Sequence, residues 1–404
     1  MLFTEIVFYK LLFYYFIMPI TIYLENNRFI VRKPEDFEAL RKSFYGEKKK
    51  GEIELSIEEV LYLMELRNAI CIEKDAENER EVGFSELITR FKKEKMFAEY
   101  ITYRDWRERG LIIKRFTGEK ENYKKNPTVK YPTEKVSFPS LNGLKAIFFE
   151  DDKIALIEDE KGKEIYKKYW FGQYGSYKAE GRGKFLKLDK FETYFLIKNC
   201  GLELSGIKKE QLEKELKKDP DFESMYNVYE DWRLAGFVVK TGFKFGTHFR
   251  IYFPGALPGK NGEWTHSKHV LHVFPREKRM IIAEWARAIR VAHGVRKTFI
   301  LAIPGKKRKE KEKIEINFLL YHRKGNGIET PEKDKPSFAM LSLSEDEMIG
   351  GNELAIAIEK AKQIGLDIIL AIADRETSVT YYRVKRIELP QSKYEYYEIE
   401  WMQP

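Results

Sequence analysis

The strongest constraint on the fold of this chain is an internal duplication. Residues 103–114 and 229–240 are identical at six of twelve positions, with an offset of 126 along the sequence. At the same offset, the dipeptide at 45–46 matches the one at 171–172. Agreement that persists over about 90 residues indicates two copies of one structural unit. The chain is therefore expected to build the same small module twice.

Each copy is expected to begin with a short hairpin and to end with a helix that runs into a strand. Residues 25–30 match 150–155 at an offset of 125, with polar Glu-Asn-Asn or Glu-Asp-Asp at the turn. Near the end of the first copy, Gly110 stands where a helix would stop, and a β-branched-rich segment follows it at once. The aromatic and leucine positions of this helix–strand motif are expected to be core.

The second copy carries an insertion. The offset between the copies rises from 126 to 133 across residues 173–184, which are rich in glycine, tyrosine and basic side chains. Two interpretations remain open. The segment is either a mobile surface loop or an RNA contact made through Lys178, Arg182 or Lys184.

A second duplication follows downstream, with an offset of 69. The helix-like segment 280–292 and the strand-like segment 299–303 parallel residues 352–361 and 368–372. Each pair predicts an amphipathic helix that feeds a buried strand, which is an α/β arrangement. The next strands are expected to match as well, 316–323 with 379–386. We therefore predict a mixed α/β fold of tandemly duplicated modules.

The two duplications overlap, and together they predict the order of the modules. The expected segments are an N-terminal extension (1–17), a first N-module (18–118), a linker (119–142), a second N-module (143–246), a C-module (247–323), a second linker (324–336) and a second C-module (337–404). Both linkers are rich in Lys, Glu, Pro and Asn, as connecting segments are.

The N-terminal stretch from Leu11 to Leu24 is apolar and free of charge, but it is shorter than the roughly 20 residues that a spanning helix needs. It is either a buried strand region or an upstream extension before a start at Met18, and we favour the extension. No membrane partner is expected.

Charge and cysteine content narrow the function classes. Lys and Arg number 73 against 64 Asp and Glu, a net charge of +9, which favours a polyanionic partner such as nucleic acid. Two cysteines are too few for a disulfide framework or a cysteine zinc site. A reducing compartment, hence a cytoplasmic location, is expected.

The histidines restrict where imidazole chemistry can occur. All six lie between residues 248 and 322, inside the middle unit. The run from His266 to His272 resembles a metal cluster, but its spacing on a strand sends neighbouring histidines to opposite faces, so we expect no metal. No phosphate-binding lysine loop, nucleophile elbow or dinucleotide-binding loop occurs, and Gly242 to Gly246 is only a β-turn signal.

The two C-modules differ at a polar constellation while their apolar scaffold is shared. Lys297 stands opposite Leu366, and His266 stands opposite Asp334 or Lys335. An arginine of the middle unit is likewise replaced by an acid in the third. The pattern predicts one working site and one structural partner, although drift at exposed positions would give the same differences.

A longer string of residues in the second half of the chain carries a resemblance to a known family. It is carried by Tyr229-Glu-Asp-Trp-Arg, Gly236 to Gly246, Phe249-Arg-Ile-Tyr252, His266-Ser-Lys-His-Val and Arg290 to Lys297. This string resembles the archaeal tRNA-splicing endonuclease (tRNA-intron endonuclease), and the module order resembles its three-unit form, which assembles as a homodimer. The resemblance implies a metal-independent endoribonuclease without a cofactor, which excises introns from precursor tRNA at bulge-helix-bulge structures.

The resemblance also implies residue roles. Tyr252 would be the general base, His266 the general acid and Lys297 the stabiliser of the phosphorane, so that the RNA ends as a 2′,3′-cyclic phosphate and a 5′-hydroxyl. Histidine suits the acid role because its unperturbed pKa lies near neutrality. Tyrosine, with an ordinary pKa near 10, is a poor base unless nearby cations lower that pKa.

Further positions are implied by the family to bind RNA or the partner subunit. Arg290 and Arg323 match a pair of arginines that sandwich a bulge base, the alternative for either being a surface ion pair. Asp374 and Glu376 fall on a turn that matches an acidic assembly loop, the alternative being an ordinary exposed turn. A metal-dependent DNA nuclease and a non-catalytic scaffold for structured RNA remain as alternative functions.

Overall fold

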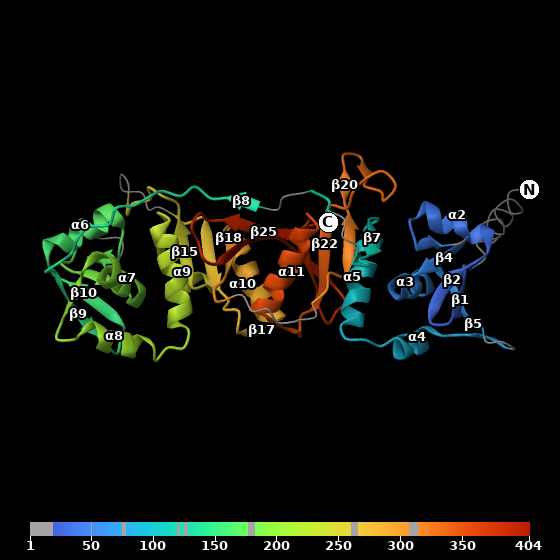
Figure 1. Cartoon of the computed structure of the whole chain (residues 1–404), viewed down its shortest axis with the longest axis horizontal. Helices are drawn as coiled ribbons and strands as arrows, with labels where there is room; N and C mark the ends of the chain where they lie inside the picture. The colour runs from blue at the N-terminus through green and yellow to red at the C-terminus, as the bar shows by residue number, and fades with distance from the viewer. Residues whose placement is uncertain are drawn as a thin grey trace, which may run out of the picture.

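The computed structural model describes residues 19–49, 51–74, 78–118, 122–124, 128–176, 182–259, 266–306 and 314–404. The two N-modules lie at opposite ends of the molecule, and the C-modules form the centre (Figure 1). The expected extension at 1–17 lies outside the described residues. In the part of the chain that the structure describes, no helix has the length and apolarity to cross a bilayer.

The first N-module is a six-stranded sheet with helices on it. The strand order is β3-β4-β2-β1-β5-β6. Its elements are β1 (Thr21–Glu25), β2 (Arg28–Val31), α2 (Pro34–Lys42), β3 (Glu47–Lys49), β4 (Glu52–Leu55), α3 (Ile57–Arg67), β5 (Ile70–Lys74), β6 (Glu79–Glu81), α4 (Phe84–Arg90), α5 (Met96–Glu108) and β7 (Ile112–Arg115). Helix α3 begins at a capping box made by Ser56 and Glu59, which satisfies two otherwise unpaired backbone N–H groups.

The second N-module repeats this plan with a five-stranded sheet in the order β11-β12-β10-β9-β13. Its elements are β9 (Lys145–Phe149), β10 (Ile154–Ile157), α6 (Glu160–Tyr169), β11 (Gln173–Tyr174), β12 (Leu186–Leu188), α7 (Lys190–Cys200), β13 (Glu203–Ser205), α8 (Lys209–Leu216), α9 (Phe222–Leu234) and β14 (Val238–Thr241). Asp189 and Glu192 form the capping box of α7. Both copies thus end in a helix that runs into a strand, as predicted for α5–β7 and α9–β14.

One continuous sheet joins both C-modules and the last strand of each N-module. Its order is β14-β15-β16-β18-β26-β25-β24-β22-β19-β7, and β8 pairs with β25 beside this path. The remaining elements are β8 (Thr128–Lys130), η1 (Phe243–Phe245), β15 (Phe249–Tyr252), β16 (His269–Val273), β17 (Arg279–Ile281), α10 (Ile282–Gly294), β18 (Thr298–Ile303), β19 (Phe318–Tyr321), β20 (Arg323–Lys324), β21 (Gly327–Ile328), β22 (Phe338–Ser344), β23 (Met348–Gly350), α11 (Gly351–Gln363), β24 (Asp367–Ala373), β25 (Val379–Glu388) and β26 (Glu395–Met402).

The opening hairpins correct one detail of the sequence alignment. Glu25 pairs with Arg28 across a turn of two residues, whereas Phe149 pairs with Ile154 across a turn of four. The single offset of 125 is therefore wrong. The closing pairs differ by 124 before the turn and by 126 after it, because the second copy has two more residues in the turn itself.

The insertion falls where it was predicted, at the tip of the next hairpin. Glu47 pairs with Glu54 in the first copy, and Gln173 pairs with Lys187 in the second. Across that hairpin the offset between paired strands rises from 126 to 133.

The expected match between 316–323 and 379–386 is wrong. Strand β19 does not pair with β18, the strand before it, but with β7 and β22. Tyr321 lies opposite Ile112 of β7 as Tyr252 lies opposite Val238 of β14. Strand β19 is thus the counterpart of β15, and each half of the sheet combines strands from distant parts of the chain.

The segment 119–142 does more than connect two modules. Strand β8 lies parallel to the end of β25, and Figure 1 shows β8 and the residues that follow it running along the top of the central sheet. Tyr131 is buried and packs edge-on against Trp232, with ring centroids 5.9 Å apart. An apolar face within a polar sequence explains why a segment of linker composition is held against the core.

Candidate active site

A cavity of about 470 Å³ opens between the second N-module and the adjoining half of the central sheet. Tyr252, His266 and Lys297 all line it, although they come from three separate segments of the chain. Tyr252 ends β15, while His266 and Lys297 precede β16 and β18. Because β16 and β18 are parallel neighbours, the residues before them meet at one edge of the sheet.

The Tyr252 ring is held by an aromatic neighbour from the N-module. Tyr252 is buried and packs against Trp170, with centroids 4.7 Å apart and planes inclined by 47°. Trp170 ends α6 in the left-handed backbone conformation, which turns the chain toward the cavity. The N-module therefore fixes the orientation of a side chain that the sheet contributes.

Lys297 is anchored to the residue that follows His266. Its Nζ donates to the backbone oxygen of Ser267 and, at 3.2 Å, to the Ser267 hydroxyl. The same ammonium lies 4.8 Å from the ring centroid of Phe245, a cation–π contact. Burial and the nearby Arg250 charge lower the pKa of Lys297.

His266 is exposed at the cavity, in contrast to the histidines that follow it. It lies before β16 and not on the strand, so the strand-face argument applies only to His269 and His272. Burial lowers the pKa of His269 to about 4 and that of His272 to about 3. These two imidazoles are neutral packing groups near neutral pH, with His269 stacked on Phe253 at 4.8 Å.

A buried ion pair builds the wall of the cavity. The Nζ of Lys240 lies 2.7 Å from Glu192 Oε1 and donates to the Gly172 oxygen at 2.7 Å, while Gly172 N–H donates to Glu192 at 2.8 Å. Gly172 has a φ of +63°, and a Cβ there would lie 2.3 Å from the Lys187 backbone oxygen. Only glycine fits this contact between the loop and the sheet.

In the first copy, the corresponding lysine, glycine and glutamate make similar contacts beside a second cleft. Lys114 Nζ donates to the Gly46 oxygen at 2.8 Å, and Gly46 N–H donates to Glu59 at 2.9 Å. A cavity of about 580 Å³ lies beside it, lined by Phe44, Gly46 and Lys114 among others. By offset, these three correspond to Trp170, Gly172 and Lys240.

The counterpart cleft has different residues at two of the three positions. His269 lies opposite Thr298 in the pairing of β16 with β18, and Phe338 lies opposite Asp367 in the pairing of β22 with β24. The two pairings differ by 69 residues on each strand, so the offset of 69 holds in both halves of the sheet. His266 therefore corresponds to Lys335, and Lys297 corresponds to Leu366.

Comparison with known proteins identifies the family. The N-terminal domain of tRNA intron endonucleases matches residues 20–88, and their catalytic C-terminal domain matches 222–316. A tRNA-splicing endonuclease of Methanococcoides burtonii is 25% identical over 347 residues, covering 69% of this chain and 94% of that protein. One of Thermococcus kodakarensis is 32% identical over 161 residues, covering 39% of this chain and 88% of that protein. The chain belongs to the tRNA-splicing endonuclease family. These matches confirm the family, the mixed α/β fold and the enzyme class that the sequence predicts.

Within this endonuclease, the two arginines singled out from the sequence lie on different elements. Arg290 is exposed on α10 and does not line the cavity; its charge lies near the buried Tyr382. Arg323 is exposed on β20, beyond β19, and donates to the Arg109 oxygen at 3.3 Å. One chain does not bring them together.

The insertion and the acidic turn are placed as follows. Lys178 lies outside the described residues, whereas Arg182 and Lys184 are exposed and do not line the cavity. Asp374 Oδ1 accepts from the N–H groups of Glu376 and Ser378, at 2.9 and 2.8 Å. Asp374 therefore shapes the turn between β24 and β25, and the Glu376 side chain is left exposed on it.

Arg250 is a cavity residue that the sequence analysis missed. Its Nε donates to the Thr241 oxygen at 2.8 Å, and its guanidinium lies 5.9 Å from the ring centroid of Tyr252. The signal was present, because residues two apart on a strand share a face, and Arg250 is two residues before Tyr252. Lys268 and Arg296, which are close to His266 and Lys297 in the sequence, do not line the cavity.

Proposed function

We propose that this family member excises introns from precursor tRNA at the cavity of Tyr252, His266 and Lys297. The observation that carries the proposal is the convergence of these three side chains, from three segments, on one cavity. The family implies the same three residue types for its cleavage reaction. The opposite half of the sheet, which has Lys335 and Leu366 at two of these positions, serves as the structural partner.

In the proposed reaction the substrate supplies its own nucleophile. Tyr252, as the phenolate, takes the proton of a 2′-hydroxyl, whose oxygen attacks the adjacent phosphorus. The bond from phosphorus to the 5′-oxygen breaks, and His266 donates its proton to that oxygen. The products are a 2′,3′-cyclic phosphate and a 5′-hydroxyl, and the balance needs neither water nor a metal ion.

The cations around the cavity suit this chemistry. The Lys297 ammonium, held by Ser267 beside His266, supplies charge for the crowded phosphorane. Arg250 adds a second positive charge beside Tyr252. A nearby cation favours the ionised phenol, which is what a tyrosine general base requires.

We further propose that two copies of the chain assemble and read a bulge-helix-bulge RNA, which is cut at two sites. Each chain has one cavity with all three residues among those described. Arg290 and Arg323 lie on different elements of one chain, as expected if partner subunits complete the binding of a flipped base. The exposed Glu376, on the turn that Asp374 shapes, is positioned as a contact for a partner.

The test is cleavage of an intron-containing precursor tRNA in excess EDTA, followed by analysis of the RNA ends. We expect cyclic phosphate and 5′-hydroxyl ends, and sedimentation of the protein as a dimer. His266→Ala should lower the rate by about 10²–10⁴-fold, because a positioned proton donor contributes that much, while RNA binding is retained.

Four results would contradict the proposal. Cleavage that requires Mg²⁺ and leaves 5′-phosphate ends would favour the metal-dependent nuclease. RNA binding without cleavage would favour the non-catalytic scaffold. Full activity of His266→Ala would contradict the role of His266 as the general acid. Sedimentation of the substrate-bound protein as a monomer would contradict the proposed dimer.

A further inference from the structure

The turn η1, between β14 and β15, exposes an aromatic side chain at the rim of the cavity. Phe243 is 87% exposed, more than any other large apolar side chain described. Its neighbours in the chain, Thr241 and Phe245, both line the cavity, and Phe245 lies under the Lys297 ammonium. One tight turn thus directs one phenylalanine into the cavity and holds another outside it.

This exposure has no role in the fold. Phe249 of the following strand is buried, and Phe245 is partly buried against the core around α10, so the turn is anchored without Phe243. Leaving such a ring in water forgoes the stabilisation that its burial would give. An exposed aromatic side chain beside a reactive cavity is therefore a candidate for ligand contact.

Among the residues that the structure describes, the opposite half has no such turn. Gly242 N–H donates to the His248 oxygen at 2.8 Å, and Phe116 N–H donates to the Asn317 oxygen at 2.9 Å, so the two donors are counterparts. After Gly242 the chain turns through η1 and continues into β15. After Phe116 it leaves the module through Thr117 and Gly118. In the described part of the chain, this turn with its exposed ring belongs to the half that carries Tyr252, His266 and Lys297.

The chemistry around the ring selects a nucleotide base as its ligand. Lys244 is exposed beside it, and the cavity behind it contains Arg250 and Lys297, which suit phosphates. An unpaired base can stack on an aromatic face whatever its sequence, because every base has a π-face. A strand whose phosphate lies in the cavity brings an adjacent base to the rim.

We propose that Phe243 is a stacking platform for an unpaired base adjacent to the scissile phosphate, and so helps this endonuclease select bulged RNA. The proposal rests on the proposed function, since it requires RNA to be cut at this cavity. Phe243 binds the substrate and takes no part in proton transfer.

The test compares Phe243→Leu with Phe243→Trp, because leucine keeps an apolar side chain without a π-face and tryptophan keeps the π-face. Both are made in the His266→Ala background, and the Kd is measured for a bulge-helix-bulge RNA and for a fully paired RNA of equal length. Phe97→Leu is the matched control, since Phe97 is 59% exposed but lies in the first N-module.

We expect Phe243→Leu to weaken binding of the bulged RNA by roughly 5- to 150-fold, the range for one lost base stack. Phe243→Trp and Phe97→Leu should change it less than twofold, and binding of paired RNA should not change. In the active enzyme, Phe243→Leu should raise KM with little change in kcat. A 2-aminopurine in the bulge should show less quenching on binding Phe243→Leu.

Equal affinity of Phe243→Leu and the parent for bulged RNA would overturn the proposal, as would an equal loss on paired RNA. A change in sedimentation with unchanged RNA binding would instead assign the ring to a protein contact. If the unaltered enzyme cuts precursor tRNA and Phe243→Leu behaves identically, only the platform fails. If the unaltered enzyme neither binds nor cuts, the proposed function fails with it.

Discussion

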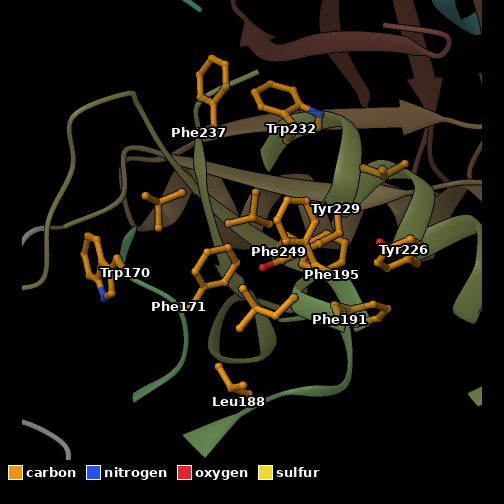
Figure 2. Close-up of a cluster of buried hydrophobic side chains, with 14 of the residues drawn as sticks. Trp170, Phe171, Leu188, Phe191, Phe195, Tyr226, Tyr229, Trp232, Phe237 and Phe249 are labelled. Carbon is orange, nitrogen blue, oxygen red and sulfur yellow. The ribbon is translucent and has the colours of Figure 1, made fainter. Parts of the chain in front are cut away.

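The two halves of the molecule share a scaffold but differ in what they bury beneath the N-module helices. In the half that carries Tyr252, His266 and Lys297, the contact is aromatic. Phe191 of α7 stacks on Phe222 at 5.5 Å and packs edge-on against Phe249 of β15 at 5.2 Å, within the cluster in Figure 2. In the other half, the same place holds charges.

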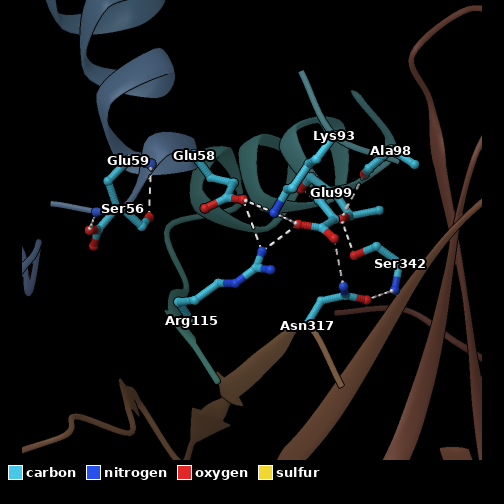
Figure 3. A network of polar contacts seen from close by, with 10 residues as sticks. Ser56, Glu58, Glu59, Lys93, Ala98, Glu99, Arg115, Asn317 and Ser342 are labelled. Atoms are coloured by element: carbon cyan, nitrogen blue, oxygen red, sulfur yellow. Dashed lines mark hydrogen bonds and ion pairs between the residues drawn. The ribbon is translucent and has the colours of Figure 1, made fainter. Parts of the chain in front are cut away.

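Figure 3 shows these charges, which form a network around Glu58 and Glu99. Arg115 bridges the two carboxylates, and Lys93 binds Glu99 at 2.7 Å. Asn317, the residue before β19, donates to Glu99 at 2.9 Å and so ties the sheet to the helix. The carboxylates are almost fully buried, with side-chain exposures of 1% for Glu58 and 7% for Glu99.

Each residue of the charge network has a counterpart at the same position of the other half. Glu58, Glu99, Arg115 and Asn317 correspond to Phe191, Met225, Thr241 and His248. One scaffold therefore accepts either an apolar contact or a compensated set of charges at the same interface. A buried charge network is tolerated when every carboxylate is paired, but it confers less stability than good apolar packing.

The largest effect is expected when Lys297 is replaced by the residue at the same position of the other half, as Lys297→Leu. The ammonium that faces the phosphorane would be lost, so we expect cleavage to fall by about 10²–10³-fold, as for the loss of one stabilising donor. The measurement is the single-turnover rate at saturating RNA, with the Tm checked separately.

The reverse change, Leu366→Lys, should leave the rate per folded enzyme unchanged, but it should lower the Tm because Leu366 is only 1% exposed. If Leu366→Lys created activity in a His266→Ala background, the inactive half would be a latent site. A Lys297→Leu enzyme with full activity would remove Lys297 from the chemistry.

The second prediction concerns the charge network. Arg115→Thr installs the counterpart residue alone and leaves Glu58 and Glu99 with Lys93 as their cation. We expect a loss of roughly 1–3 kcal/mol in the free energy of unfolding, below the range for fully buried pairs because Arg115 is 30% exposed. Chemical denaturation measures it.

The triple variant Glu58→Phe, Glu99→Met and Arg115→Thr copies the apolar half and should recover most of that loss. Cleavage should be unaffected in both variants, since the network lies away from the cavity. If the triple variant were less stable than Arg115→Thr, the two halves would differ in the geometry of this interface and not only in how its charges are compensated.

Much of this organisation follows from sequence, because repeats and local patterns depend on neighbouring residues. The helix–strand ends at Gly110 and Gly236, and the insertion at 173–184, were all placed correctly. The register of the sheets assigns His266 to Lys335, where the sequence left Asp334 open. A constant offset of 69 from β15 to β24 could have resolved that ambiguity.

What sequence did not reveal is which strands pair. Residues 318–321 are a short apolar strand, and nothing in such a strand specifies whether its neighbour is β18 or β7. The same holds for Tyr131, whose partners Trp232 and Phe253 lie over 100 residues away. The spacing of Arg250 from Tyr252 placed both on one face of β15, but only the structure shows that the N-module closes a cavity over that face.

The smallest effect expected concerns Asp189, which caps α7 at the cavity where Ser56 caps α3. Burial, with Glu192 beside it, raises the pKa of Asp189 to about 7. The folded state therefore binds a proton that the unfolded chain releases near its ordinary pKa of about 4, so this contribution to stability declines as pH rises toward 7 and is lost above it. Asp189→Ser keeps a cap and removes the titration. Its free energy of unfolding, from urea denaturation, should fall less between pH 5 and pH 8, by at most roughly 1.4 kcal/mol per pH unit. Ser56→Asp should introduce the same pH dependence into the first module, because Glu59 and Lys114 surround that cap as Glu192 and Lys240 surround Asp189. Parallel pH profiles for all three proteins would mean that Asp189 ionises normally, and that the two caps differ only in the hydrogen bonds they make.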